Sequence, residues 1–114
     1  MDECLFCKIV NDEIPCEIVF KNEHVLAFRD VNPQAPTHIL VIPRKHISTV
    51  NELETKDALL VGEIFLTAKN LAKVENIDQD GFRTVFNCNK DGGQTVFHIH
   101  LHLLGGRRFS WPPG

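Results

Sequence analysis

The chain has 114 residues, a formal net charge of −3, 43% hydrophobic residues and 24% charged residues. This composition is typical of a folded globular protein and argues against disorder, and the length suits one domain over residues 1–114. The negative charge, with no basic run longer than Arg107-Arg108, argues against a nucleic-acid partner.

The N-terminal sequence Met1-Asp2-Glu3 is acidic and leads into no apolar segment of the kind found in signal peptides. No apolar run in the sequence approaches the ~20 residues of a membrane helix. We therefore expect a cytoplasmic protein with no membrane contact. In that compartment its four cysteines are expected to be reduced thiols or metal ligands rather than disulfides.

The first half of the chain predicts a short helical segment followed by strands. Residues 4–10 form an apolar segment of one or two helical turns. Residues 17–21 and 25–30 are typical of two strands joined as a hairpin. Residues 32–36 form a loop with two prolines, and residues 38–43 form an aliphatic strand that ends at Pro43.

The second half predicts one long helix and two further strands. Thr55 is the expected N-cap, Asp57 lies in the first turn, and the helix is expected to end near Glu75-Asn76. Apolar residues recur at helical spacing at Val61, Ile64, Phe65, Ala68, Leu71 and Ala72. Strands are expected over 82–87 and 97–104, separated by a glycine turn over 89–93. The fold class is therefore α+β, with a five-stranded, mostly antiparallel sheet and one long helix.

The last predicted strand carries three histidines at alternate positions. In a strand, His98, His100 and His102 share one face, while Ile99, Leu101 and Leu103 share the other and suit a core. A single histidine on a strand is more often structural than catalytic. Three imidazoles in register would repel one another if protonated, so they must be partly neutral, bound to a metal or paired with an anion.

Residues 98–104 match the His-φ-His-φ-His-φ-φ signature of the histidine triad (HIT) family, where φ is apolar. Further blocks resemble its Hint branch, the purine nucleoside phosphoramidases; they are residues 28–30, 33–38, 43–47, 92–94 and the closing 111–114. The resemblance covers nearly the whole chain. It implies a HIT-like fold with a short N-terminal helical segment, and no organic cofactor.

The resemblance implies that His100 attacks the α-phosphorus of a nucleoside phosphoramidate and forms a nucleotidyl-histidine, which water then hydrolyses. A neutral imidazole is a competent nucleophile near pH 7, so the residue type agrees. His102 is expected to donate to the phosphate oxygens. His38 is implied as a supporting hydrogen-bond partner, although from sequence alone a pocket and a surface position are equally open.

Other residues match the family's nucleotide contacts. Asp30 resembles the acid that binds the ribose hydroxyls, although an aspartate at a strand end also makes turns. Thr95 stands where most Hint proteins carry serine and keeps the hydroxyl. The glycine turn could hold a phosphate or be a plain hairpin turn. The residues implied at the phosphate are Asn87, Gly93 and Gln94, and those implied in the base pocket walls are Phe6, Phe28 and Ile9, the last of which also suits an ordinary core.

Cys4 and Cys7 form a C-x-x-C pair, which alone is a weak signal because redox motifs and zinc half-sites share it. A structural zinc site needs two more ligands. Resemblance to zinc-containing members of the superfamily implies that His46 and His98 complete a structural Zn²⁺ site. Cys16 and Cys88 are expected to be buried thiols.

The resemblance implies a hydrolase that cleaves the P–N bond of purine nucleoside 5′-phosphoramidates and releases a nucleoside monophosphate and an amine. A nucleotidyltransferase branch carries glutamine at the third triad position, where this chain has His102. A dinucleoside polyphosphate hydrolase and a non-catalytic nucleotide- or zinc-binding scaffold remain alternatives. The resemblance also implies a homodimer, for which Leu59, Leu60 and Leu66 offer apolar surface beyond the helix stripe.

Overall fold

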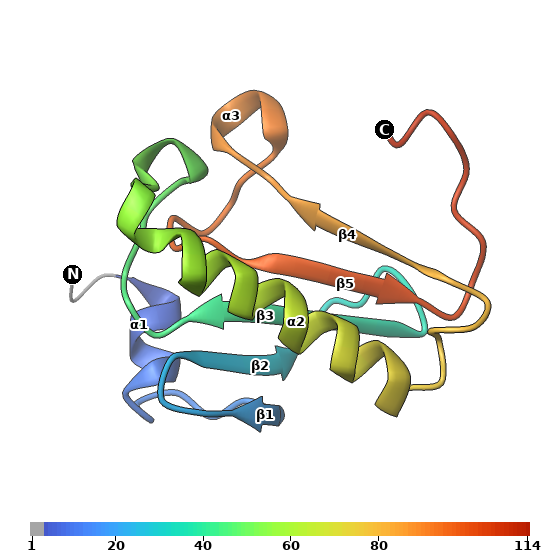
Figure 1. The fold of residues 1–114 in the computed structure, drawn as a ribbon, viewed down its shortest axis with the longest axis horizontal. Coiled ribbons are helices and arrows are strands. Elements are labelled where there is room, and N and C mark those ends of the chain that lie inside the picture. The colour runs from blue at the N-terminus through green and yellow to red at the C-terminus, as the bar shows by residue number, and fades with distance from the viewer. Residues whose placement is uncertain (1–3) are drawn as a thin grey trace.

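The computed structural model describes residues 4–114, so the expectation about a signal peptide rests on residues outside it. The elements in chain order (Figure 1) are α1 (Leu5–Val10), β1 (Ile18–Lys21), β2 (Val25–Arg29), β3 (Thr37–Pro43), α2 (Ala58–Val74), β4 (Phe82–Phe86), α3 (Asn89–Gly92) and β5 (Leu101–Gly105). Within residues 4–114, no helix combines the length and apolar character needed to cross a membrane.

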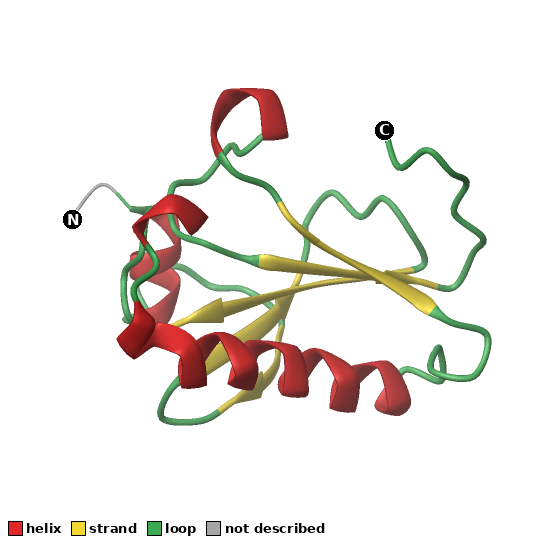
Figure 2. Cartoon of the chain, turned by 45° about the horizontal axis from the view of Figure 1, so that its top comes forward, coloured by secondary structure: helices red, strands yellow, loops and turns green. Residues whose placement is uncertain are grey.

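The five strands form one sheet in the order β1-β2-β3-β5-β4, and every neighbouring pair is antiparallel. The predicted α+β fold is therefore confirmed. Helix α2 runs along one face of the sheet (Figure 2). The central strand β3 is buried along its whole length, because both of its faces are covered, and this explains its unbroken aliphatic sequence.

Side chains that alternate along the strands divide the core into two layers. Ile39 and Val41 of β3 pack with Leu101 and Leu103 under α2. Leu26, Phe28, Leu40 and Ile42 face the other way and pack with Phe6 and Ile9 of α1. The second layer lies on the same sheet face as His38 and His102, since His38 pairs with Leu104 and Leu40 pairs with His102.

Helix α2 confirms most of the predicted stripe, because Ile64, Ala68, Leu71 and Ala72 are buried. Phe65, which the spacing placed in the same stripe, is 45% exposed, so the stripe prediction is wrong at this position. Thr55 is not the N-cap of α2. Thr55–Asp57 form a separate 3₁₀ turn, because the Asp57 carboxylate accepts the backbone N–H of Glu54 at 2.9 Å and the ammonium of Lys45 at 2.8 Å.

Two local predictions near the histidines need correction. The expected turn over 89–93 contains the one-turn helix α3, which Gly93 ends in the left-handed conformation at φ +83°. The expected strand over 97–104 begins only at Leu101. The backbone N–H of Ile99 instead bonds the carbonyl of Ile47, in the segment after β3, at 2.8 Å. Of the three histidines, only His102 therefore lies in a strand.

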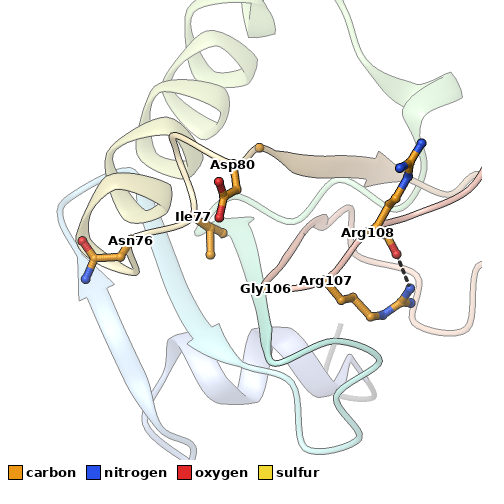
Figure 3. Close-up of a pocket in the computed structure, with 7 residues that line it drawn as sticks. Asn76, Ile77, Asp80, Gly106, Arg107 and Arg108 are labelled. Carbon is orange, nitrogen blue, oxygen red and sulfur yellow. Dashed lines mark hydrogen bonds between the residues drawn. The ribbon is translucent and has the colours of Figure 1, made fainter.

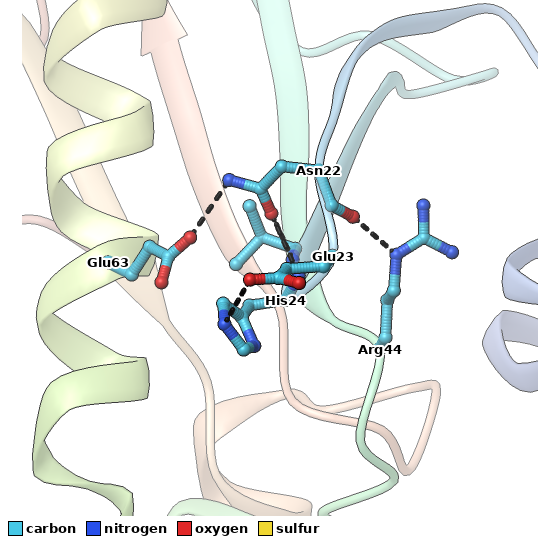
Figure 4. A network of polar contacts seen from close by, with 6 residues as sticks. Asn22, Glu23, His24, Arg44 and Glu63 are labelled. Carbon is cyan, nitrogen blue, oxygen red and sulfur yellow. Dashed lines mark hydrogen bonds and ion pairs between the residues drawn. The ribbon is translucent and has the colours of Figure 1, made fainter.

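The turn between β1 and β2 is tied to its neighbours by Asn22 (Figure 4). Its side-chain oxygen accepts the backbone N–H groups of His24 and Val25, and its side-chain amide donates to Glu63 of α2 at 2.9 Å. Arg44, just after β3, donates to the Asn22 carbonyl at 2.6 Å. This polar network fixes the hairpin against the helix without using any of the candidate site residues.

Candidate functional site

Four side chains from three separate segments meet at the N-terminal end of α1. The Sγ of Cys4 lies 3.4 Å from Nδ1 of His98, and the Sγ of Cys7 lies 3.3 Å from Nδ1 of His46 and 3.6 Å from Nδ1 of His98. All four ligand atoms lie within 4.8 Å of one another. A tetrahedral zinc ion with ordinary bond lengths places sulfur and nitrogen ligands roughly 3.6 Å apart. The cluster therefore fits a zinc site.

The surroundings of the cluster suit metal binding. The Nε2–H of His98 donates to the carbonyl of Pro43 at 2.7 Å, which leaves Nδ1 as the free lone pair. Cys4 is the N-cap of α1, and its Sγ accepts the backbone N–H of Cys7 at 3.3 Å. The same contact would stabilise Cys4 as a thiolate, the form that binds metal. Burial and the neighbouring Cys4 raise the pKa of Cys7 to about 11. Metal binding at this site is therefore expected to release protons.

His100 is held by a main-chain contact from the residue two positions earlier. Its Nδ1–H donates to the carbonyl of His98 at 2.8 Å, and the ring is 7% exposed. Because Nδ1 carries the hydrogen, the lone pair lies on Nε2. Burial lowers the pKa of His100 below its usual value, which keeps the ring neutral. His100 thus offers an oriented nitrogen nucleophile.

His100 lines a cavity of about 380 Å³ between α1, β2 and the segment before β5. The size suits a small organic ligand. Its polar members include His102, Asp30 and the exposed Thr95, while Phe6, Ile9 and Phe28 belong to its apolar walls. The Phe6 ring stands edge-on to both Phe28 and His100, at centroid distances of 5.4 and 5.1 Å. Apolar walls at one end and histidines at the other suit a nucleotide.

A larger cavity of about 500 Å³ lies between the end of α2 and the segment after β5 (Figure 3). Its lining includes Asp80, Arg107 and Arg108, and no histidine or cysteine lines it. The oriented nitrogen of His100 is absent there, so the smaller cavity is the candidate site.

His102, His38 and Asp30 form a second polar cluster. Nε2 of His38 lies 2.9 Å from Nδ1 of His102 and 3.4 Å from Oδ2 of Asp30, and Nδ1 of His38 accepts the backbone N–H of Gln34 at 3.0 Å. Burial lowers the pKa of His102 to about 4 and also lowers the pKa of His38. The Nε2 of His102 is buried and has no hydrogen-bond partner among residues 4–114.

These three residues also lie close enough together to hold a metal ion, but their donor chemistry does not fit one. A histidine that binds metal through Nε2 normally carries its hydrogen on Nδ1 and donates it to an acceptor. Nδ1 of His38 instead faces a backbone N–H donor. The cluster around Cys4 has the correct arrangement, and the cluster around Asp30 does not.

Three of the predicted phosphate contacts do not line the cavity. All the polar atoms of the Gln94 side chain are already bonded within the protein: its oxygen accepts the N–H of Asn89, and its amide donates to the carbonyl of Val96 and to that of Ser48, in the segment after β3. Gly93 is exposed at the end of α3 and Asn87 is half-buried before it. The residue types did not indicate the contacts of the Pro43 carbonyl and the Gln34 N–H with the histidines, because every backbone carries such groups.

Comparisons with known proteins agree with this architecture. The family model described as "HIT domain" matches residues 11–109. An uncharacterized HIT-like protein of Synechococcus elongatus is 49% identical over 99% of this chain and 98% of its own length. The purine nucleoside phosphoramidase of Escherichia coli is 48% identical, over 93% of this chain and 89% of its own. The crystal structure of a HIT family hydrolase from Legionella pneumophila shares 55% identity at a TM-score of 0.97, covering 98% of this chain and all of that one. The chain therefore belongs to the HIT family.

Proposed function

We propose that the protein, as a single HIT domain over residues 1–114, hydrolyses the P–N bond of purine nucleoside 5′-phosphoramidates. The observation that carries the proposal is the His100 imidazole, whose Nδ1–H is fixed on the His98 carbonyl, in a residue that lines the 380 Å³ cavity. The 48% identity to a purine nucleoside phosphoramidase favours P–N over P–O cleavage.

The proposed reaction has two steps. In the first, the lone pair of His100 Nε2 forms a bond to the α-phosphorus, the P–N bond breaks, and the amine leaves with a proton that passes from solvent water through the Thr95 hydroxyl. In the second, water attacks the phosphorus and gives up a proton to solvent. The electron pair of the P–N bond to His100 returns to Nε2, and the nucleoside monophosphate departs. The His98 carbonyl stabilises the positive charge that develops on the ring during attack.

The surrounding residues provide binding and charge stabilisation. The buried Nε2 of His102 is proposed to donate to the phosphate oxygens, with His38 behind it. Asp30 is proposed to accept from the ribose hydroxyls, and the Phe6 and Phe28 rings to bind the base. Asn87, Gly93 and Gln94 do not line the cavity, and we propose that they serve its phosphate end indirectly, by holding the loop that carries Thr95.

The cysteine and histidine cluster is proposed to hold structural zinc through Cys4, Cys7, His46 and His98. The ion would attach α1, and with it Phe6, to the segment that carries His100. It takes no part in the two steps. Because the site requires reduced thiols, the proposal implies a reducing compartment such as the cytoplasm.

We also propose that the protein is a homodimer. Strand β4 is an edge of the sheet, and α2 exposes Leu59 at 89%, Leu66 at 58% and Phe65 at 45%. The Phe65 and Phe86 rings lie 5.9 Å apart, so this side of α2 adjoins the β4 edge. Sedimentation at micromolar concentration is expected to give twice the chain mass of 12.9 kDa, and a single-chain mass would contradict the dimer.

The test of the proposed function is amine release from a fluorogenic adenosine phosphoramidate. Wild type and a His24→Ala control, altered at a surface histidine, are expected to turn over equally. His100→Ala is expected to lose at least about 10³-fold in kcat while still binding adenosine monophosphate. Equal turnover by His100→Ala would refute the nucleophile. Binding without turnover in wild type would favour the non-catalytic scaffold.

A further inference from the structure

The hydrogen positions on His38 and His102 follow from one backbone contact. The N–H of Gln34 can only donate, so Nδ1 of His38 must be the acceptor at 3.0 Å and the ring hydrogen must lie on Nε2. That hydrogen faces two acceptors, Nδ1 of His102 at 2.9 Å and Oδ2 of Asp30 at 3.4 Å. His102 therefore accepts through Nδ1 and carries its own hydrogen on Nε2, the atom left without a partner among the described residues.

The backbone of Gln34 is also held by a residue from the far end of the chain, through the carbonyl one peptide unit beyond the N–H that faces His38. Nε and Nη2 of Arg107 donate to the Gln34 carbonyl at 3.2 and 3.1 Å. Gly106 makes this approach possible, because its φ is +93° and a Cβ there would lie 2.8 Å from Cβ of Pro36. The loop before β3 and the segment after β5 are thus in direct contact.

Arg107 is in turn held in place. Its Nη1 donates to the carbonyl of Arg108 at 3.1 Å (Figure 3), and its guanidinium stacks over the Phe109 ring at 4.2 Å. The planar guanidinium thus uses three of its nitrogens on two carbonyls. Arg107 and the neighbouring Arg108 are both exposed, but no side-chain hydrogen bond joins Arg108 to the described residues.

We infer that Arg107 is a positioning residue for the histidine cluster. By holding the Gln34 carbonyl, Arg107 keeps the adjoining Gln34 N–H aimed at His38. This fixes the tautomer of His38 and, through it, that of His102, so that an N–H rather than a lone pair is presented to the phosphate end of the cavity. A lone pair at Nε2 of His102 would repel the phosphate oxygens. The consequence for catalysis rests on the proposed function, whereas the tautomers and their dependence on Arg107 do not.

The tautomers are measured directly by two-bond ¹H–¹⁵N correlation spectra of the ¹⁵N-labelled, zinc-loaded full chain at neutral pH. In wild type we expect His38 and His102 to carry hydrogen on Nε2 only and His100 on Nδ1 only. A hydrogen on Nδ1 of His102, or a doubly protonated ring at His38 or His102, would overturn the inference without any variant being made.

The dependence on Arg107 is tested with Arg107→Ala against the matched control Arg108→Ala. Arg107→Ala is expected to give mixed tautomers at His38 and His102. Its kcat is expected to fall about tenfold, the smallest loss typical when a residue that supports a functional histidine is removed, with KM little changed. Arg107→Lys, which keeps one donor, is expected to recover part of both. Arg108→Ala should match wild type. Unchanged histidine spectra in Arg107→Ala would refute the role of Arg107. If the histidine spectra change in Arg107→Ala but even wild type shows no turnover, only the proposed function is refuted.

Discussion

The ring of Phe6 stands nearly perpendicular to that of His100, with the centroids 5.1 Å apart and an interplanar angle of 83°. Phe6 lies between Cys4 and Cys7 in the sequence, so the segment that supplies two thiols to the metal cluster also places an aromatic wall against the proposed nucleophile. The same ring also stands edge-on to His98, with the ring centroids 6.0 Å apart. Metal cluster and cavity therefore share one wall.

Replacing Phe6 by leucine is expected to weaken nucleotide binding more than it lowers the stability of the fold. The substitution keeps an apolar side chain of similar size but removes the aromatic edge, worth about 1 kcal/mol, or a factor of about five in the Kd for adenosine monophosphate. Titration calorimetry measures this change. Phe20→Leu, altered at a residue of β1 that does not line the cavity, is the control. An unchanged Kd in Phe6→Leu would show that this ring is no part of the base site.

Removal of the metal is expected to loosen α1. Protein purified without chelator should contain one zinc per chain by elemental analysis, and Cys7→Ser should contain none. The loss is expected to cost on the order of 3 kcal/mol of unfolding free energy, because α1 then keeps only its apolar packing. Cys88→Ser, which lies outside the cluster, should retain zinc and stability. Wild type without zinc would contradict the assignment.

Gln94 is expected to act on stability more than on direct binding. Replacing it by alanine leaves the N–H of Asn89 and the carbonyls of Ser48 and Val96 without their partner, at a cost of about 2–3 kcal/mol. Urea unfolding measures the loss, and Gln79→Ala, an exposed glutamine, should change it by less than about 0.5 kcal/mol. A stable Gln94→Ala protein with weaker nucleotide binding would instead return Gln94 to the direct contacts.

The ion pair of Glu75 and Arg29 is expected to make part of the unfolding free energy depend on pH in the acid range. Two hydrogen bonds from Arg29, at 3.0 and 2.9 Å, hold the pKa of Glu75 below its usual value of 4.5. The unfolded chain therefore binds this proton at higher pH than the native chain does. The stabilisation is complete above pH 4.5 and is lost as pH falls through the lower native value.

Glu75→Gln should therefore reduce stability at pH 7 and flatten its fall below pH 4.5, as measured by thermal unfolding across pH. Glu17→Gln removes a looser and more exposed partner of the same arginine, at 3.4 Å, and is expected to change little. An acid limb that is identical in Glu75→Gln and wild type would contradict the prediction.

Hydrophobic patterning was enough to predict most of the fold. The alternation of Ile99, Leu101 and Leu103 predicted the layer under α2, and the apolar spacing in 64–72 predicted the face that α2 buries. Patterning failed where a specific hydrogen bond decides the backbone. Asp57 bonds the N–H of Glu54 and so starts a 3₁₀ turn where an α-helical cap was expected.

The candidate site was predicted only at the level of side-chain chemistry. Resemblance to the HIT family was sufficient to name the four residues of the metal cluster, which the structure brings together. It could not distinguish Gln94, whose side-chain polar atoms are bonded to other backbone groups of the protein, from a residue that faces a ligand. Nor could it identify the N–H of Gln34, since every residue except proline has one and only the path of the chain aims it at His38.

His98 contributes to the two sites through different parts of the same residue. Its imidazole belongs to the metal cluster, whereas its carbonyl oxygen holds the Nδ1–H of His100. A carbonyl is present whatever side chain position 98 carries. Substitutions that abolish metal binding can therefore leave the proposed nucleophile oriented, provided that the backbone keeps its path. Loss of the ion and loss of the chemistry are thus separable events in the evolution of such a chain, and a descendant could drop the first while retaining the second.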